Sequence, residues 1–234
     1  LPNKDGSFTV TLFLLSKGKE LSFEAIQDEA ALMALFNDNF PDFVPYVPDL
    51  ATQFFQHPTG HLGTVTCRGW AYRDKAVILG DAAHAMVPFH GQGMNAAFES
   101  CRDLNRQMQR YPDDWARAFG EFEAARAPNT DAIAEMSLNN YLEMRSGVTD
   151  PRYVLKKAIA FELEKRYPNR FVPRYSMVMF HTLPYREAKI RGQAQDEIIN
   201  TLTERAGSLE QVDFALADRL IRDCELLQHA IIEV

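Results

Sequence analysis

The sequence has little of what is typical of nucleic-acid-binding, metal-binding or membrane-spanning proteins. Its 25 Lys and Arg residues are outnumbered by 32 Asp and Glu, which gives a net charge of -7, whereas phosphate binding depends on a basic surface. The three cysteines, Cys67, Cys101 and Cys224, lie far apart and form no CxxC pair. No apolar run reaches the roughly 18 residues of a membrane-spanning helix. We therefore expect no nucleic-acid partner, no metal, no membrane span and a reducing, cytoplasmic location.

What the sequence does contain is apolar residues in regular patterns. Of its 234 residues 46% are hydrophobic, enough for one large or two small domains. Alternation over 8–14 and 62–67, and the apolar run 76–79, predict strands, and Ser22 is a candidate cap for a helix over 22–36. From Gly93 onward the pattern is helical, over 97–108, 115–127, 129–144, 151–167, 187–206 and 209–232. The first part thus mixes sheet and helix, and the second is helical.

A strand, a loop and a helix start are predicted in residues 76–95, AVILGDAAHAMVPFHGQGMN. The strand ends at Gly80-Asp81, where a carboxylate can accept hydrogen bonds from the vicinal hydroxyls of a sugar chain. After Pro88, the glycines Gly91 and Gly93 open a helix, whose first N–H groups favour an anion or an electron-rich carbonyl. This stretch is therefore the predicted site of a polar cofactor.

Three further features each have two interpretations. Phe13 lies on the face of its predicted strand that also carries Thr9 and Thr11. It would belong either to a second small core or to a ligand pocket. Asn140 interrupts an apolar helix face, either in a satisfied helix–helix contact or in a binding site, since a buried amide needs partners. Residues 170–177 combine aromatic rings and arginines, as in a structural strap or a pocket lining.

The run GDAAHAMVPFHGQGMNAAFES resembles the second FAD-binding motif of the flavin-dependent aromatic hydroxylases, whose pattern is Gly-Asp-Ala-Ala-His, a Pro, then Gly-x-Gly-x-Asn. Within that family, NNYLEM and FVPRYSMVMF resemble the members that hydroxylate L-kynurenine at ring position 3. The resemblance implies an oxidoreductase of tryptophan catabolism and NAD biosynthesis, a flavoprotein monooxygenase that uses FAD, NADPH and O2.

The family's fold implies an α+β/α/β architecture, a Rossmann-like FAD-binding fold with a substrate-domain β-sheet and a C-terminal helical domain. Mapped onto this chain, residues 1–75 would belong to the substrate-binding domain and 76–127 to the FAD-binding domain. Residues 128–234 would form the helical domain.

Site residues follow from the motif positions. The resemblance implies that the cofactor contacts Asp81, Pro88, Gly91, Gln92, Gly93, Met94 and Asn95. It implies that the substrate contacts Phe13, Phe89, His90, Asn140, Met144 and Tyr175. No residue is assigned as a catalytic acid or base and none as a metal ligand, because the protein's task in such enzymes is to position the flavin and to exclude water.

The chain departs from the family in two places. Members begin with a strand–GxGxxG–helix unit, and no GxGxxG is present here; we therefore expect the C-terminal part of an enzyme, inactive without an N-terminal half. Residues 209–234 are amphipathic, unlike the membrane anchor of the mitochondrial members. We expect this segment to pack on the rest of the protein or on a partner, for which a homodimer is one possibility. The alternatives are a flavin hydroxylase of another phenol or arylamine, and a non-catalytic helical binding module.

Overall fold

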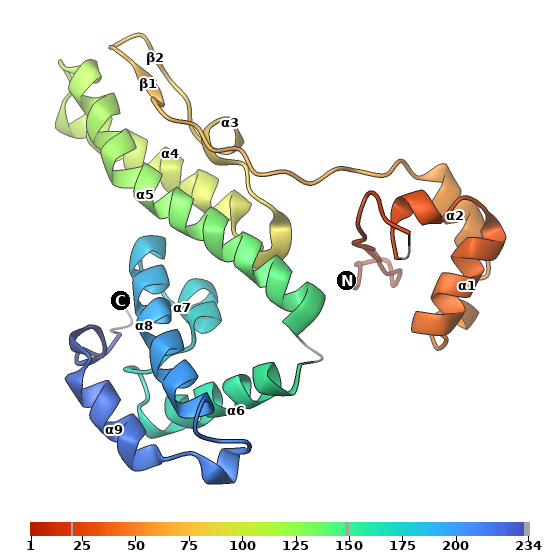
Figure 1. Cartoon of the computed structure of the whole chain (residues 1–234). Helices are drawn as coiled ribbons and strands as arrows, with labels where there is room; N and C mark the ends of the chain where they lie inside the picture. Colours follow the sequence, from red (N-terminus) through yellow and green to blue (C-terminus); the bar gives the residue numbers. More distant parts are fainter. Residues whose placement is uncertain (20, 148–149, 232–234) are drawn as a thin grey trace. The chain divides into compact units, whose positions relative to one another are not determined.

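A computed structural model describes residues 1–19, 21–147 and 150–231. Contacts divide the chain into two units, Leu1–Leu62 and Gly63–Val234 (Figure 1). The sequence had placed boundaries after residues 75 and 127 instead. The described residues are mostly helical and contain one two-stranded sheet.

The first unit is a small helical cluster. It contains η1 (Phe23–Ala25), α1 (Glu29–Asn39), η2 (Val44–Tyr46) and α2 (Leu50–Gln56). Ser22 caps only the short η1, whereas α1 begins after Asp28, whose Oδ1 accepts a hydrogen bond from Ala31 N at 2.8 Å. The predicted start of the main helix at Ser22 is therefore wrong by six residues. The core of the unit consists of Ile26, Leu32, Phe36 and Leu50.

The strand predicted over residues 8–14 is not formed. The described residues around it make only isolated bridges, Pro2 with Phe8 and Leu15 with Ser22. A strand requires a continuous row of backbone partners, and no described segment supplies that row here. Leu12 and Leu14 pack on the core of this unit, whereas Phe8 and Val10 on the same predicted face are exposed, so the buried face is confirmed only in its second half.

The second unit begins with a hairpin that leads to the Gly-Asp loop. Strands β1 (Ala71–Tyr72) and β2 (Ala76–Val77) pair antiparallel, with Ala71 opposite Val77. Then follow α3 (Asp81–His84), η3 (Pro88–His90) and α4 (Gly93–Arg110), and the prediction that Gly93 opens a helix is confirmed. The strand predicted over 62–67 is wrong: Val65 N and Cys67 N donate to the carbonyls of Ala85 and Ala83, which belong to no strand.

Helix α5 (Trp115–Leu142) runs beside α4 as one 28-residue helix (Figure 1). The sequence predicted an end near Pro128, because proline removes a helical N–H donor. Only the carbonyl of Ala124 loses its helical donor, and the helix continues because residues on both sides of Pro128 are buried, Phe122 before it and Ala132 and Ile133 after it. The predicted boundary after residue 127 thus falls inside a helix.

The remainder of the chain packs around α8. It comprises the π-helical turn η4 (Glu143–Gly147), α6 (Pro151–Arg166), α7 (Arg174–Phe180), α8 (Tyr185–Thr203), η5 (Leu209–Gln211), α9 (Phe214–Asp223) and η6 (Glu225–Leu227). Residues 170–177, which lie outside the predicted helices, are helical from Arg174 onward. The predicted helix over 209–232 is interrupted at Val212-Asp213, where Asp213 Oδ1 caps α9 by accepting from Leu216 N.

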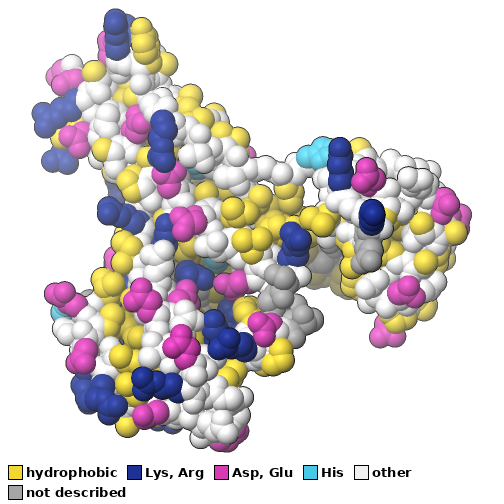
Figure 2. Space-filling model, in the orientation of Figure 1, with side chains coloured by type: hydrophobic (Ala, Val, Ile, Leu, Met, Phe, Trp, Pro, Cys, Tyr) yellow, Lys and Arg dark blue, Asp and Glu magenta, His cyan; other side chains and the backbone are white. Residues whose placement is uncertain are grey.

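Two hydrophobic cores meet at α8. Tyr185 and Ala188, near its start, pack with residues of α4, α5 and α7, whereas Ile198 and Leu202, near its end, pack with α6 and α9. Acidic and basic side chains are intermixed over the face shown in Figure 2. Within the described ranges, no helix is both long and apolar enough to cross a bilayer. Because both cores contain residues of α8, this helix connects the α4–α5 pair to the C-terminal helices.

Candidate functional site

The Gly-Asp loop presents an exposed carboxylate. Gly80 has φ 60° and ψ −145°, a combination that side chains disfavour, and it precedes the first turn of α3. Asp81 follows directly and is exposed. Among the described residues its carboxylate has no hydrogen-bond or ion-pair partner, so its oxygens are available to the hydroxyls of a ligand.

Behind this loop, a buried histidine ties α3 to α4. His84 Nε2 lies 3.1 Å from Ser100 Oγ, and its ring packs on Trp70 with centroids 5.4 Å apart. Since Ser100 Oγ donates to Ala96 O at 2.9 Å, it accepts from His84, which is assigned as the Nε2–H tautomer. Burial lowers the pKa of His84, so the neutral form is favoured. His84 is therefore structural.

The first turn of α4 faces outward. Gly91 adopts a left-handed conformation with φ 65° and turns the chain from η3 into the helix. The first helical bond is Ala96 N to Gln92 O at 2.9 Å, so the N–H groups of Gly93, Met94 and Asn95 have no partner within the helix. Met94 is 68% exposed. This turn can donate to an electronegative edge of a cofactor.

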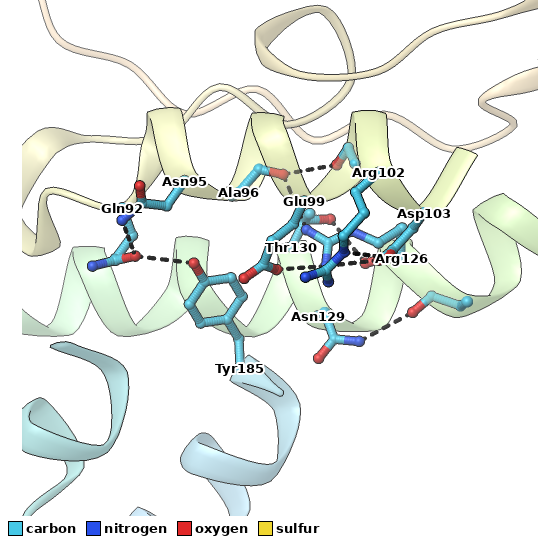
Figure 3. A network of polar contacts seen from close by, with 12 residues as sticks. Gln92, Asn95, Ala96, Glu99, Arg102, Asp103, Arg126, Asn129, Thr130 and Tyr185 are labelled. Carbon is cyan, nitrogen blue, oxygen red and sulfur yellow. Dashed lines mark hydrogen bonds and ion pairs between the residues drawn. The ribbon is translucent and has the colours of Figure 1, made fainter. Parts of the chain in front are cut away.

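Gln92 differs from the other predicted cofactor residues because its side chain points inward. It is only 5% exposed; Oε1 accepts from Tyr185 OH and from Asn95 Nδ2, each at 3.0 Å, and Nε2 lies 3.2 Å from Met179 Sδ. Figure 3 shows the Gln92 amide between Asn95 and Tyr185. Only the backbone of Gln92 is left to face a cofactor.

Five of the six predicted substrate residues come together from three segments. Asn140 Nδ2, on α5, donates to Phe89 O at 2.6 Å and lies 3.9 Å from Met144 Sδ. The His90 ring stacks on that of Tyr175, on α7, with centroids 5.3 Å apart and planes at 21°. Phe13 lies in the first unit, so its part in the site stays a prediction.

An acidic residue that the sequence analysis missed lies beside this cluster. Glu143 accepts hydrogen bonds from Arg174 at 3.3 Å and from Lys157 at 3.4 Å. Burial lowers the pKa of His90, the nearby Arg174 lowers it further, and Glu143 opposes both. The signal was present in the sequence: Glu143 follows Asn140 by three residues, which places both on neighbouring positions of a helix.

A buried arginine beneath α4 was also missed. Arg126, on α5, is 4% exposed and donates to Glu99 Oε2 at 2.8 Å and to Ala96 O at 3.1 Å (Figure 3). It occupies a core position in the helical series Phe119, Phe122, Arg126, where an ionised side chain must be paired. The pair fixes the first turns of α4 to α5.

A concavity of about 480 Å³ is lined by other residues. Pro184, Ile190 and Leu226 supply its apolar lining, and it shares no residue with the predicted site. The chemistry of the Gly-Asp loop and of the cluster around Asn140, rather than the size of a hollow, marks the candidate site.

The family described as FAD binding domain matches residues 48–119, which include the Gly-Asp loop and α4. A protein of Stenotrophomonas maltophilia (strain K279a), named kynurenine 3-monooxygenase, is 48% identical over 221 residues, 94% of this chain and 48% of that protein. The chain is a relative of the kynurenine 3-monooxygenases. The chain is also similar to two other proteins with that name. The protein of Legionella pneumophila (strain Corby) is 43% identical over 93% of this chain and 46% of its own length. The protein of Flavobacterium johnsoniae is 44% identical over 85% of this chain and 44% of its own length.

The similarity to the kynurenine 3-monooxygenase of Stenotrophomonas maltophilia extends over 94% of this chain. The matched FAD binding domain contains the seven predicted cofactor residues. Asn140, Met144 and Tyr175 lie beyond it. The chain spans about half the length of the curated relatives it matches.

Proposed function

We propose that this chain is part of an FAD-dependent monooxygenase that hydroxylates L-kynurenine to 3-hydroxykynurenine with NADPH and O2. The observation that carries the proposal is the meeting of Phe89, His90, Asn140, Met144 and Tyr175 beside the start of α4. The names of the relatives support the choice of substrate. The activity belongs to the whole protein, including a Rossmann-like FAD domain; the homodimer and the cytoplasmic location stay predictions.

The residues at the two helix starts suit FAD. The exposed carboxylate of Asp81 accepts hydrogen bonds from ribose or ribityl hydroxyls, and Gly80 lets the backbone approach them. The free N–H groups of Gly93, Met94 and Asn95 donate to the electron-rich edge of the ring, in the positive field of the helix start. Pro88, Gly91 and the backbone of Gln92 shape the same loop. FAD, when bound, supplies the redox chemistry.

Asn140 and Tyr175 would hold the amino-acid head group of kynurenine. Because Nδ2 of Asn140 donates to Phe89 O, its Oδ1 is left as an acceptor suited to the substrate ammonium. Tyr175 is half-exposed and supplies a hydroxyl. Phe89 and His90, with Met144 and Phe13, would flank the aryl ring. The chain's residues thus bind, orient and exclude water, and no acid or base among them is required.

The test is to purify the whole protein and to measure its flavin absorbance, NADPH oxidation and product. We expect bound FAD, kynurenine-dependent NADPH oxidation and 3-hydroxykynurenine, and no turnover by the 234-residue chain alone. A whole protein without flavin would favour the non-catalytic helical module. Hydroxylation of a simple phenol in preference to kynurenine would favour the other flavin hydroxylases.

A further inference from the structure

One buried amide joins three helices at the start of α4. Oε1 of Gln92 accepts from Tyr185 OH on α8 and from Asn95 on α4, and Nε2 lies 3.2 Å from Met179 Sδ on α7. The cofactor contacts assigned above do not use this side chain. Its burial and its partners therefore call for a separate explanation.

The contacts of α7 show what the amide does. Tyr175 and Met179 are four residues apart, so they lie on one face of α7. That face meets two residues of one loop, since His90 stacks on Tyr175 and Gln92 contacts Met179. Helix α7 has seven residues and no side-chain cap, and so short a helix has little stability of its own. Its position depends on contacts with other elements, which are the core around Met177 and Val178 on one face and the loop residues His90 and Gln92 on the other.

Tyr185 determines which way the amide points. Burial, aided by Glu99, raises the pKa of Tyr185 to about 12, so the hydroxyl remains a proton donor at neutral pH. With two donors directed at Oε1, the Nε2 group is directed at Met179. The hydrogen bond from Tyr185 on α8 thus stabilises one orientation of the Gln92 amide, and in that orientation Nε2 contacts Met179 on α7.

We propose that Gln92, oriented by Tyr185, is a positioning residue that fixes helix α7 against the cofactor loop, so that Tyr175 keeps one place relative to the flavin. The proposal rests on the proposed function, because it assigns the loop to FAD and Tyr175 to the substrate. It predicts that loosening the amide raises KM for kynurenine while FAD remains bound.

The experiment uses the whole protein with Tyr185→Phe, Met179→Leu and the double variant. Tyr185→Phe removes one hydroxyl and keeps the ring in its core position, and Met179→Leu removes the sulfur and keeps an apolar side chain. The matched control is Tyr111→Phe, which changes a tyrosine at the other end of α4. The 18 residues of α4 place it about 27 Å along the helix from Gln92, at about 1.5 Å per residue.

We expect Tyr185→Phe to raise KM about 3- to 10-fold and Met179→Leu less, with kcat and FAD content near those of the wild type. In the double variant the KM effects should be less than multiplicative, because both act through one amide. If KM of Tyr185→Phe stays within about twofold of the Tyr111→Phe control, or the two effects multiply, the inference is wrong. A wild-type whole protein that binds no FAD, or does not respond to kynurenine, would instead contradict the proposed function.

Discussion

Replacing Gly192 by Ala tests the most crowded of the described glycine positions. Gly192 lies inside α8, and a Cβ there would fall 2.7 Å from Arg174 Cδ and 2.9 Å from both Cβ and Cγ. Arg174 cannot easily move away, because its guanidinium is held by Asp196 at 2.8 Å and by Glu143 at 3.3 Å. An added methyl must therefore displace the start of α7.

The magnitude follows from a comparison with Gly120, inside α5, where an added Cβ meets nothing within 4 Å. Gly→Ala in a helix interior stabilises by about 1 kcal/mol, so Gly120→Ala should gain that amount. At Gly192 the same gain is opposed by overpacking of about 1–3 kcal/mol and by weakened ion pairs of about 0–1 kcal/mol. We expect Gly192→Ala to be less stable than Gly120→Ala by the sum of these two terms, about 1–4 kcal/mol.

The assay is urea unfolding of the whole protein, with both variants beside the wild type. In an Arg174→Ala background the contacts with Cγ and Cδ disappear and only that with Cβ remains, so the penalty at Gly192 should become smaller. If Gly192→Ala matches Gly120→Ala in stability, the stem of Arg174 does not lie over α8 as described. KM for kynurenine should also rise in Gly192→Ala, since Tyr175 follows Arg174 in sequence.

Three further predictions concern single side chains. Asn140→Ala should raise KM of the whole enzyme for kynurenine about tenfold or more, as expected for the loss of one buried charge-assisted hydrogen bond, and should scarcely affect an arylamine without the amino-acid head group; equal effects on both would exclude a role in binding that group. The pKa of His84 is lowered from 6.5 in the folded state, so the unfolded chain binds the proton more readily. The contribution of neutral His84 to the free energy of unfolding is therefore complete above about pH 6.5. It is lost as the pH falls, by at most about 1.4 kcal/mol per pH unit. Urea unfolding between pH 8 and 5, the range around the ordinary histidine pKa, should show a shallower loss in His84→Gln, whose amide can still donate to Ser100; an unchanged slope would contradict this assignment. Arg126→Met should lower the free energy of unfolding by about 1–3 kcal/mol through the lost bonds to Glu99 and Ala96 O, and an unchanged stability would show that they contribute nothing net.

Much of the secondary structure of the second unit could be predicted from the sequence, because the signals that mark its helices are local. Gly93 after Gln92, Asp150 before Pro151 and the apolar stripe of α4 mark helix ends and faces through interactions within a few residues. The strand predicted at 8–14 failed for the opposite reason, since alternation within a segment does not show whether a partner strand is present, and Phe8 and Val10 are exposed. The predicted helix end at Pro128 is wrong because the loss of one backbone donor is outweighed by packing of α5 on both sides of the proline, at Phe122 and at Ile133.

The sequence by itself determined the kind of site. The Gly-Asp turn, the glycines that open α4 and the free N–H groups there depend on backbone conformations that these residue types favour locally, whatever packs around them. The tertiary structure alone decided which side chains face the site. Gln92 points into the core, and Asn140 reaches Phe89, because α5, α7 and α8 bring together residues 51 to 93 positions apart. Such contacts depend on how helices pack, and helix packing is not encoded in any short stretch of sequence.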